Sequence, residues 1–127
     1  MLRGLGDVDR LLGRLGAARD AFTRALEALR ELGSAGGQAF ALRGLGDTER
    51  ADGRAAEARA AYGEARGIFE RIGNRRGLAD VLRGLGQVAP TAAEAREAFS
   101  GALAVYEELG ASRSAQECRE RLAALTE

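Results

Sequence analysis

Three arginines that recur every 40 residues are the side chains best suited to bind a ligand. They are Arg3, Arg43 and Arg83. A guanidinium donates two parallel hydrogen bonds to a carboxylate, so a row of arginines on one surface would suit an acidic or carboxylate-ended segment. Asp7 and Asp47 follow the first two arginines by four residues and could instead neutralise them, an interaction worth about 0.3–0.5 kcal/mol. Gln87 takes that place after Arg83, which makes Arg83 the best candidate for an anionic contact.

Catalytic and metal chemistry have few residues to use. The chain has no His and a single Cys, Cys118, so most metal sites and nucleophilic dyads lack parts. Its acidic residues are spread along predicted helix surfaces, with no pocket to shift a pKa. The string RGLGD resembles a phosphate-binding loop, but that loop needs a strand before its glycines, and here helix is predicted. We therefore expect no enzyme activity, no cofactor and no metal.

Composition limits the class of protein and its partners. The 127 residues suffice for one domain, and 19 basic residues balance 19 acidic ones, which argues against nucleic acid and membrane partners. No apolar run approaches the length of a membrane span, and one cysteine without a partner favours a reducing, cytoplasmic setting. Every basic residue is Arg, which suggests a GC-rich bacterial genome.

A short string repeats three times along the chain. LRGLGD at residues 2–7 returns as LRGLGD at 42–47 and as LRGLGQ at 82–87. The interval is 40 residues each time, and five of the six positions are identical in all copies. Such regular repetition predicts stacked structural units that bury a core between neighbours.

A second motif follows each copy and predicts a helix with one apolar face. Its members have the order small, aromatic, small, large, large: Ala18, Phe22, Ala25, Leu29 and Leu32; Ala58, Tyr62, Ala65, Phe69 and Ile72; Ala95, Phe99, Ala102, Tyr106 and Leu109. Steps alternating between three and four residues place all members of a set on one helix face.

Glycines and one proline mark where the predicted helices end. Gly33, Gly73 and Gly110 follow the last large apolar residue of each second motif, as left-handed C-terminal glycines do. Gly13 and Gly53 are predicted to break the chain inside the first two units, and Pro90 stops the corresponding helix of the third. The result is seven predicted helices: 2–13, 16–32, 35–52, 54–72, 75–88, 91–109 and 112–126.

These helices divide into three units and a terminal segment. The predicted units are about 1–34, 35–73 and 74–110, and residues 111–127 form a C-terminal capping helix with one apolar stripe. No capping helix precedes the first copy in this sequence, so self-association through the N-terminal end is a second expectation.

The combined motifs resemble those of the tetratricopeptide repeat family. That family has Leu-Gly in the first helix of each unit and Ala, aromatic, Ala in the second, as this chain has at Leu5-Gly6 with Ala18, Phe22 and Ala25. The resemblance implies an all-α, right-handed superhelical solenoid of antiparallel helix pairs. The 40-residue period is similar to that of kinesin light chains and bacterial signalling proteins. Asp9 and Glu49 depart from the family, which usually has a large aromatic at that position.

The resemblance also implies where a partner binds. In this family the first helices line a concave groove, and the matching positions here are Arg3, Asp7, Phe40, Arg43, Asp47, Arg50, Asp80, Arg83 and Gln87. The implied function is a non-catalytic scaffold that binds a protein or peptide segment, with an acidic one favoured by the arginines. The alternative is a structural spacer, sensor or self-association arm of a larger bacterial signalling regulator. Gly4, Gly44 and Gly84 have two open readings: close approach of a ligand backbone, or a glycine-rich composition.

Overall fold

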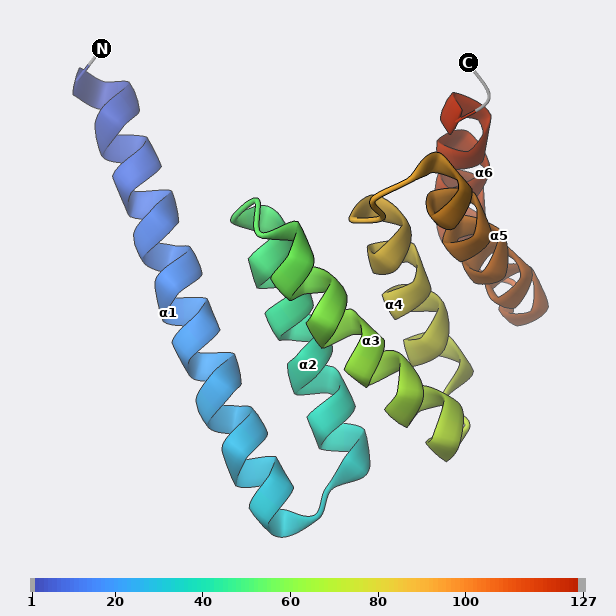
Figure 1. The fold of residues 1–127 in the computed structure, drawn as a ribbon, viewed down its shortest axis with the longest axis horizontal. Coiled ribbons are helices and arrows are strands. Elements are labelled where there is room, and N and C mark those ends of the chain that lie inside the picture. The colour runs from blue at the N-terminus through green and yellow to red at the C-terminus, as the bar shows by residue number, and fades with distance from the viewer. Residues whose placement is uncertain (1, 126–127) are drawn as a thin grey trace.

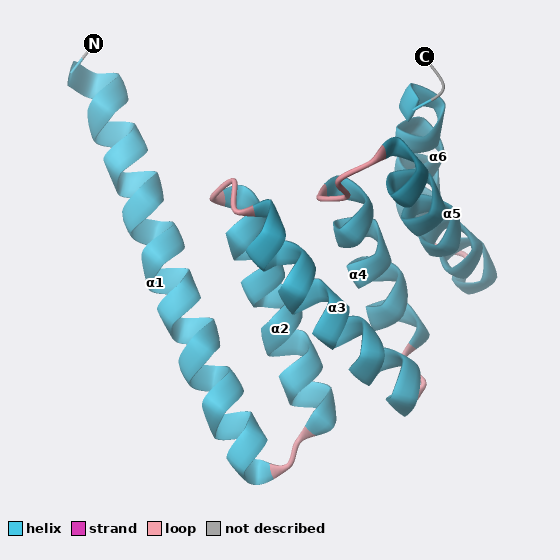
Figure 2. Ribbon diagram, viewed as in Figure 1, coloured by secondary structure: helices cyan, strands magenta, loops and turns pink. Residues whose placement is uncertain are grey.

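The computed structural model describes residues 2–125, with side chains from residue 13 onward. Over that range the chain is all-helical, with no strand (Figures 1 and 2). The helices are α1 (Leu2–Leu32), α2 (Ala35–Ala51), α3 (Ala55–Ile72), α4 (Arg75–Gln87), α5 (Ala92–Leu109) and α6 (Ser112–Leu125). They run back and forth in chain order, and each packs on the next, which makes an all-α solenoid.

The first helix differs from the prediction. A break was expected near Gly13, but α1 continues through Gly13 and Gly16 and projects beyond the end of α2 (Figure 1). Neither glycine adopts a positive φ, and a Cβ on either would meet nothing within 4 Å, so no contact forces the chain to turn there. Gly53 does have a left-handed φ of 75°, and the chain turns at that point between α2 and α3.

The predicted helix ends elsewhere are confirmed. Gly33, Gly73 and Gly110 all adopt positive φ angles between 69° and 74° directly after a helix. At the next helix start, the Asn74 side chain accepts a hydrogen bond of 2.8 Å from the backbone N–H of Gly77. Thr91, directly after Pro90, accepts one of 3.1 Å from the backbone N–H of Glu94 and so begins α5.

The apolar side chains form two clusters that meet at α4. One cluster joins α1, α2 and α3 and includes Tyr62 and Phe69, and the other joins α5 and α6 and includes Tyr106 and Cys118. Leu78 and Leu85 of α4 pack against both clusters. The core is therefore continuous along the solenoid, with α4 as the shared element.

The aromatic rings of the second motif pack against the repeated glycines. Tyr62 is fully buried between α2 and α4, where a Cβ on Gly46 would lie 2.7 Å from its ring and one on Gly84 would lie 2.6 Å from it. Phe22 occupies the same kind of place against Gly44, and Phe99 against Gly86. Neither ligand approach nor composition explains the described glycines at 44 and 84, because a ring of the preceding unit needs that space.

Glu49, the departure from the family's aromatic, is a buried charge. Its side chain accepts a hydrogen bond from Arg19 of α1 and forms a 3.4 Å ion pair with Arg54. Arg19 also donates to Asp52 at 2.6 Å. The hydrogen bond to Glu49, and next the one to Asp52, raise the pKa of the Arg19 guanidinium. These contacts tie α1 to the turn that follows α2.

No helix within residues 2–125 is long and apolar enough to cross a membrane.

Candidate functional site

Six of the nine predicted site residues line one polar hollow of about 280 Å³. These six are Arg43, Asp47, Arg50, Asp80, Arg83 and Gln87, and Glu117 of α6 completes the lining. The hollow is therefore formed by alternate helices, α2, α4 and α6, and we call it the polar groove.

Asp80 is the most firmly held residue of the polar groove. Its carboxylate accepts a 2.5 Å hydrogen bond from the hydroxyl of Tyr106 and a 2.9 Å bond from Nη1 of Arg43. Arg76, one helical turn earlier, lies 3.5 Å from the same carboxylate. With these partners and only 15% of its side chain exposed, Asp80 is committed to the fold and unavailable to a cationic ligand.

The alternative in which Asp47 neutralises Arg43 is not found among the described side chains. Arg43 reaches across to Asp80 on the next first helix, while Asp47 accepts a hydrogen bond from the hydroxyl of Tyr62. Arg50, one turn further along α2, lies 3.8 Å from Asp47 and donates to the side-chain oxygen of Gln87. Polar contacts of these residues therefore run between units as well as along one helix.

Arg83 has the longest side-chain hydrogen bond of the three arginines of the polar groove. Its Nη1 atom lies 3.4 Å from Oε2 of Glu117, at the long limit of a hydrogen bond, and both side chains are partly exposed, at 29% and 40%. The guanidinium also lies 5.7 Å from the ring centroid of Tyr106. Arg83 has no carboxylate four residues later, as the sequence shows, but it has a loose pair with Glu117, 34 residues away.

Charges in the polar groove balance. Three arginines meet three carboxylates, and Gln87 is neutral. The groove is therefore not a uniformly cationic surface. Any preference for an acidic segment must arise because a carboxylate of the ligand replaces one of the groove's own carboxylates.

Of the other three predicted residues, Phe40 has a described side chain, and it does not line the hollow. Phe40 is 48% exposed at the start of α2, where it packs edge-on against Phe69 with ring centroids 5.4 Å apart. The guanidinium of Arg43 lies 5.2 Å from the Phe40 centroid, so Phe40 adjoins the groove. Arg3 and Asp7 belong to α1, and their side chains fall outside the described residues.

Glu117 is the groove residue that the sequence prediction missed. It lies seven residues after Gly110, as Asp80 lies seven after Gly73 and Phe40 seven after Gly33. Counting from the turn glycines, and not from the LRGLG string, would have found it. That string has no intact copy in α6.

Two tyrosines that bond to groove carboxylates, and Cys118 of α6, have raised pKa values. Burial and then a hydrogen bond to Asp47 raise the pKa of Tyr62, and burial with Asp80 does the same for the pKa of Tyr106, so both phenols stay protonated. Burial raises the pKa of the Cys118 thiol, which is fully enclosed. Among the residues with described side chains, no group of three or more His, Cys, Asp or Glu could hold a metal.

The fold is similar to that of a solved bacterial protein. The crystal structure of BtubC (BKLC) from P. vanneervenii matches with a TM-score of 0.65 and 20% sequence identity, over 90% of this chain and 57% of that one. The chain thus spans little more than half the length of that structure. No family profile and no curated protein matches the sequence. The predicted tetratricopeptide-like repeat fold is confirmed.

Proposed function

We propose that the chain is a non-catalytic protein-interaction scaffold whose polar groove binds a segment of another protein. The observation that carries this proposal is the loose pair between Arg83 and Glu117. A carboxylate of the partner would replace Glu117 on Arg83, where it can accept two hydrogen bonds. Asp80, with its three partners, would stay in place and keep the groove's shape.

The mechanism is recognition by a preformed surface. Arg43 and Arg50 are already oriented by Asp80 and Gln87, so binding does not have to order them. The partner segment bears most of the ordering cost, and it gains a charge-assisted bond at Arg83. Because the groove is neutral overall, we expect selectivity for a correctly spaced carboxylate and not for high negative charge in general.

Selection from a random peptide library tests the proposal. Wild type and Arg83→Gln would be panned side by side, and the enriched peptides measured by titration. We expect enrichment of peptides with a carboxylate that is essential for binding, and affinity about tenfold weaker for Arg83→Gln. Glu117→Gln should bind the same peptides more tightly, because it removes the internal competitor.

Arg96→Gln is the matched control, since Arg96 is an exposed arginine of α5 outside the groove. Circular dichroism would first establish that all variants fold alike. Peptides that bind wild type, Arg83→Gln and Glu117→Gln equally would overturn the groove proposal. Tighter binding by Glu117→Gln is the decisive sign, because a merely destabilising change would not produce it.

The exposed motif of α1 favours a second candidate, a self-association arm. Phe22 is only half-buried, whereas its counterparts Tyr62 and Phe99 are 0% and 3% exposed. In the second and third units this stripe is covered by the helix that carries LRGLG, but in α1 residues 2–12 continue away from it. Residues 2–12 of a second copy would supply the missing cover by an exchange of helices.

Light scattering over a wide concentration range tests this candidate. We expect wild type to form dimers, and a variant without residues 1–12 to remain monomeric. A monomer at every concentration would rule out the arm and leave the groove as the functional surface.

A further inference from the structure

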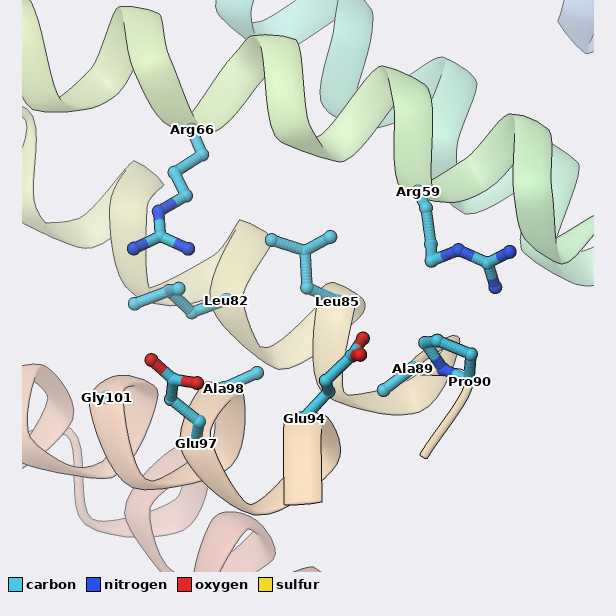
Figure 3. Close-up of a pocket in the computed structure, with 10 residues that line it drawn as sticks. All are labelled: Arg59, Arg66, Leu82, Leu85, Ala89, Pro90, Glu94, Glu97, Ala98 and Gly101. Atoms are coloured by element: carbon cyan, nitrogen blue, oxygen red, sulfur yellow. The ribbon is translucent and has the colours of Figure 1, made fainter. Parts of the chain in front are cut away.

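A second hollow lies on another face of α4, between α3 and α5. It has a volume of about 380 Å³, and Leu82 and Leu85 of α4 form its floor (Figure 3). None of the residues that line the polar groove lines this hollow. We call it the α3–α5 crevice.

The crevice exists where the middle unit departs from its neighbours. Arg66 directly follows Ala65 of the apolar motif, at the position that Leu26 has after Ala25 and Leu103 has after Ala102. Leu26 is 6% exposed within the core, and Leu103 packs on the core of the third unit. Arg66 is instead exposed, pairs with Glu70 of its own helix at 2.8 Å, and lines the crevice. A charged side chain has therefore taken the place of an apolar one that fills the structure in both other units.

A second departure leaves Arg59 without the carboxylates of its counterpart. Arg19, one unit earlier, is bonded to the buried Glu49 and to Asp52. Forty residues after Glu49 the chain has Ala89, so Arg59 donates instead to the backbone oxygen of Val88, at 2.8 Å. One hydrogen bond to a carbonyl leaves most of the five donors of its guanidinium available.

The opposite wall of the crevice is acidic. Glu94 and Glu97 of α5 are exposed, and within the described side chains neither carboxylate has an ion pair or hydrogen bond. Figure 3 shows both carboxylates reaching toward the leucines of α4, with Arg66 opposite them on α3. The crevice thus has a basic wall, an apolar floor and an acidic wall.

We propose that the α3–α5 crevice binds a partner segment in which an apolar side chain stands between an acidic and a basic residue. The apolar side chain would contact Leu82 and Leu85, with the acidic residue toward Arg66 and the basic residue toward Glu94 and Glu97. Charge complementarity with the two walls selects this chemistry over a segment of uniform charge. The volume is large enough for a few side chains, at the lower end of the range of ligand pockets.

An array of synthetic peptides tests the proposal on the full chain. Each peptide places Leu between two positions varied among Asp, Glu, Lys and Arg, within an uncharged frame of Ala and Gln. We expect peptides with one acidic and one basic residue to bind at least tenfold better than those with two like charges. Arg66→Leu should abolish this binding while folding normally, because it installs the residue that the other two units use.

Arg83→Gln distinguishes this proposal from that for the polar groove, since it should weaken binding there and leave the crevice peptides unaffected. The proposal is overturned if no peptide of mixed charge is preferred, if binding survives in Arg66→Leu, or if only Arg83→Gln removes it. Sedimentation of the peptide-free protein tests whether a second copy of the chain occupies the crevice instead. A dimer in wild type that Arg66→Leu dissociates would assign the crevice to a second copy and likewise overturn the proposal.

Discussion

At the scale of single residues, the fold depends on pairs of a ring and a glycine. A glycine inside a helix costs about 1 kcal/mol relative to alanine, and Gly46 and Gly84 both carry that cost. In return the ring of Tyr62 lies between them with no exposure to solvent, and its hydroxyl reaches Asp47 at the edge of the polar groove. The same side chain therefore joins two units and orients a groove residue.

Alanine substitutions separate the packing role of a glycine from its helix propensity. A Cβ at Gly84 would lie 2.6 Å from Cζ of Tyr62, so we expect Gly84→Ala to lower the free energy of unfolding by about 1–2 kcal/mol, overpacking minus the gain in propensity. Gly63→Ala is the control, because a Cβ there meets nothing within 4 Å, and it should raise stability by about 1 kcal/mol. Urea denaturation measures both, and equal stability of the two variants would contradict the packing explanation.

The two tyrosines predict a loss of stability at high pH. Burial and acceptor carboxylates raise the pKa of Tyr62 and Tyr106 above the ordinary value of about 10, so the folded state retains protons that the unfolded state has lost. The stabilisation is complete below about pH 10 and declines as the pH rises further toward the folded-state pKa values. We expect phenolate absorbance to appear together with the loss of helical circular dichroism. This should occur at a pH well above the midpoint of phenolate formation in the urea-unfolded protein. Phenolate formation near pH 10 in a fully helical protein would show that the hydroxyls are accessible.

At the scale of elements, what could be predicted depended on whether a residue's neighbours are close in sequence. Gly73 and Thr91 act on their own helix ends, and both were predicted correctly. Gly13 was expected to act as Gly53 does, but the turn at Gly53 is also held from another helix by Arg19. The partners of Arg43 and Arg83 lie 37 and 34 residues away, so helix spacing alone could not find them.

Distance measurements between spin labels test the continuity of α1. Labels at residues 3 and 24, in a Cys118→Ala background, would be about 32 Å apart along one straight helix, at 1.5 Å per residue. A helix hairpin with a turn near Gly13 would bring the backbones to about 10 Å, the usual separation of packed helices. Labels at residues 43 and 64, on the α2–α3 hairpin, provide the short-distance reference. A single short distance at 3 and 24 would contradict the continuous helix.

At the scale of the whole molecule, contacts of the described side chains join each unit to its neighbour along the chain. Ion pairs link Arg30 to Glu64 and Arg75 to Glu108, and α4 connects the two apolar clusters through Leu78 and Leu85. Stability in such an array is close to a sum over units and their interfaces. The apolar core joins each helix to the next one along the chain. A segment bound in the polar groove would contact α2, α4 and α6 at once and so would add a direct link between units.

Removing α6 tests this local coupling and the predicted capping role of residues 111–127. Ala115 and Cys118 of α6 pack in one cluster with Val105 and Tyr106 of α5, so truncation after Gly110 would expose apolar side chains of α5. We expect amide hydrogens of α5 to exchange about tenfold faster or more, because local opening there becomes easier, while those of α2 and α3 change little. Hydrogen exchange followed by mass spectrometry resolves these segments. An equal loss of protection in α2, α3 and α5 would mean that the array unfolds as one unit, and the nearest-neighbour description would then fail.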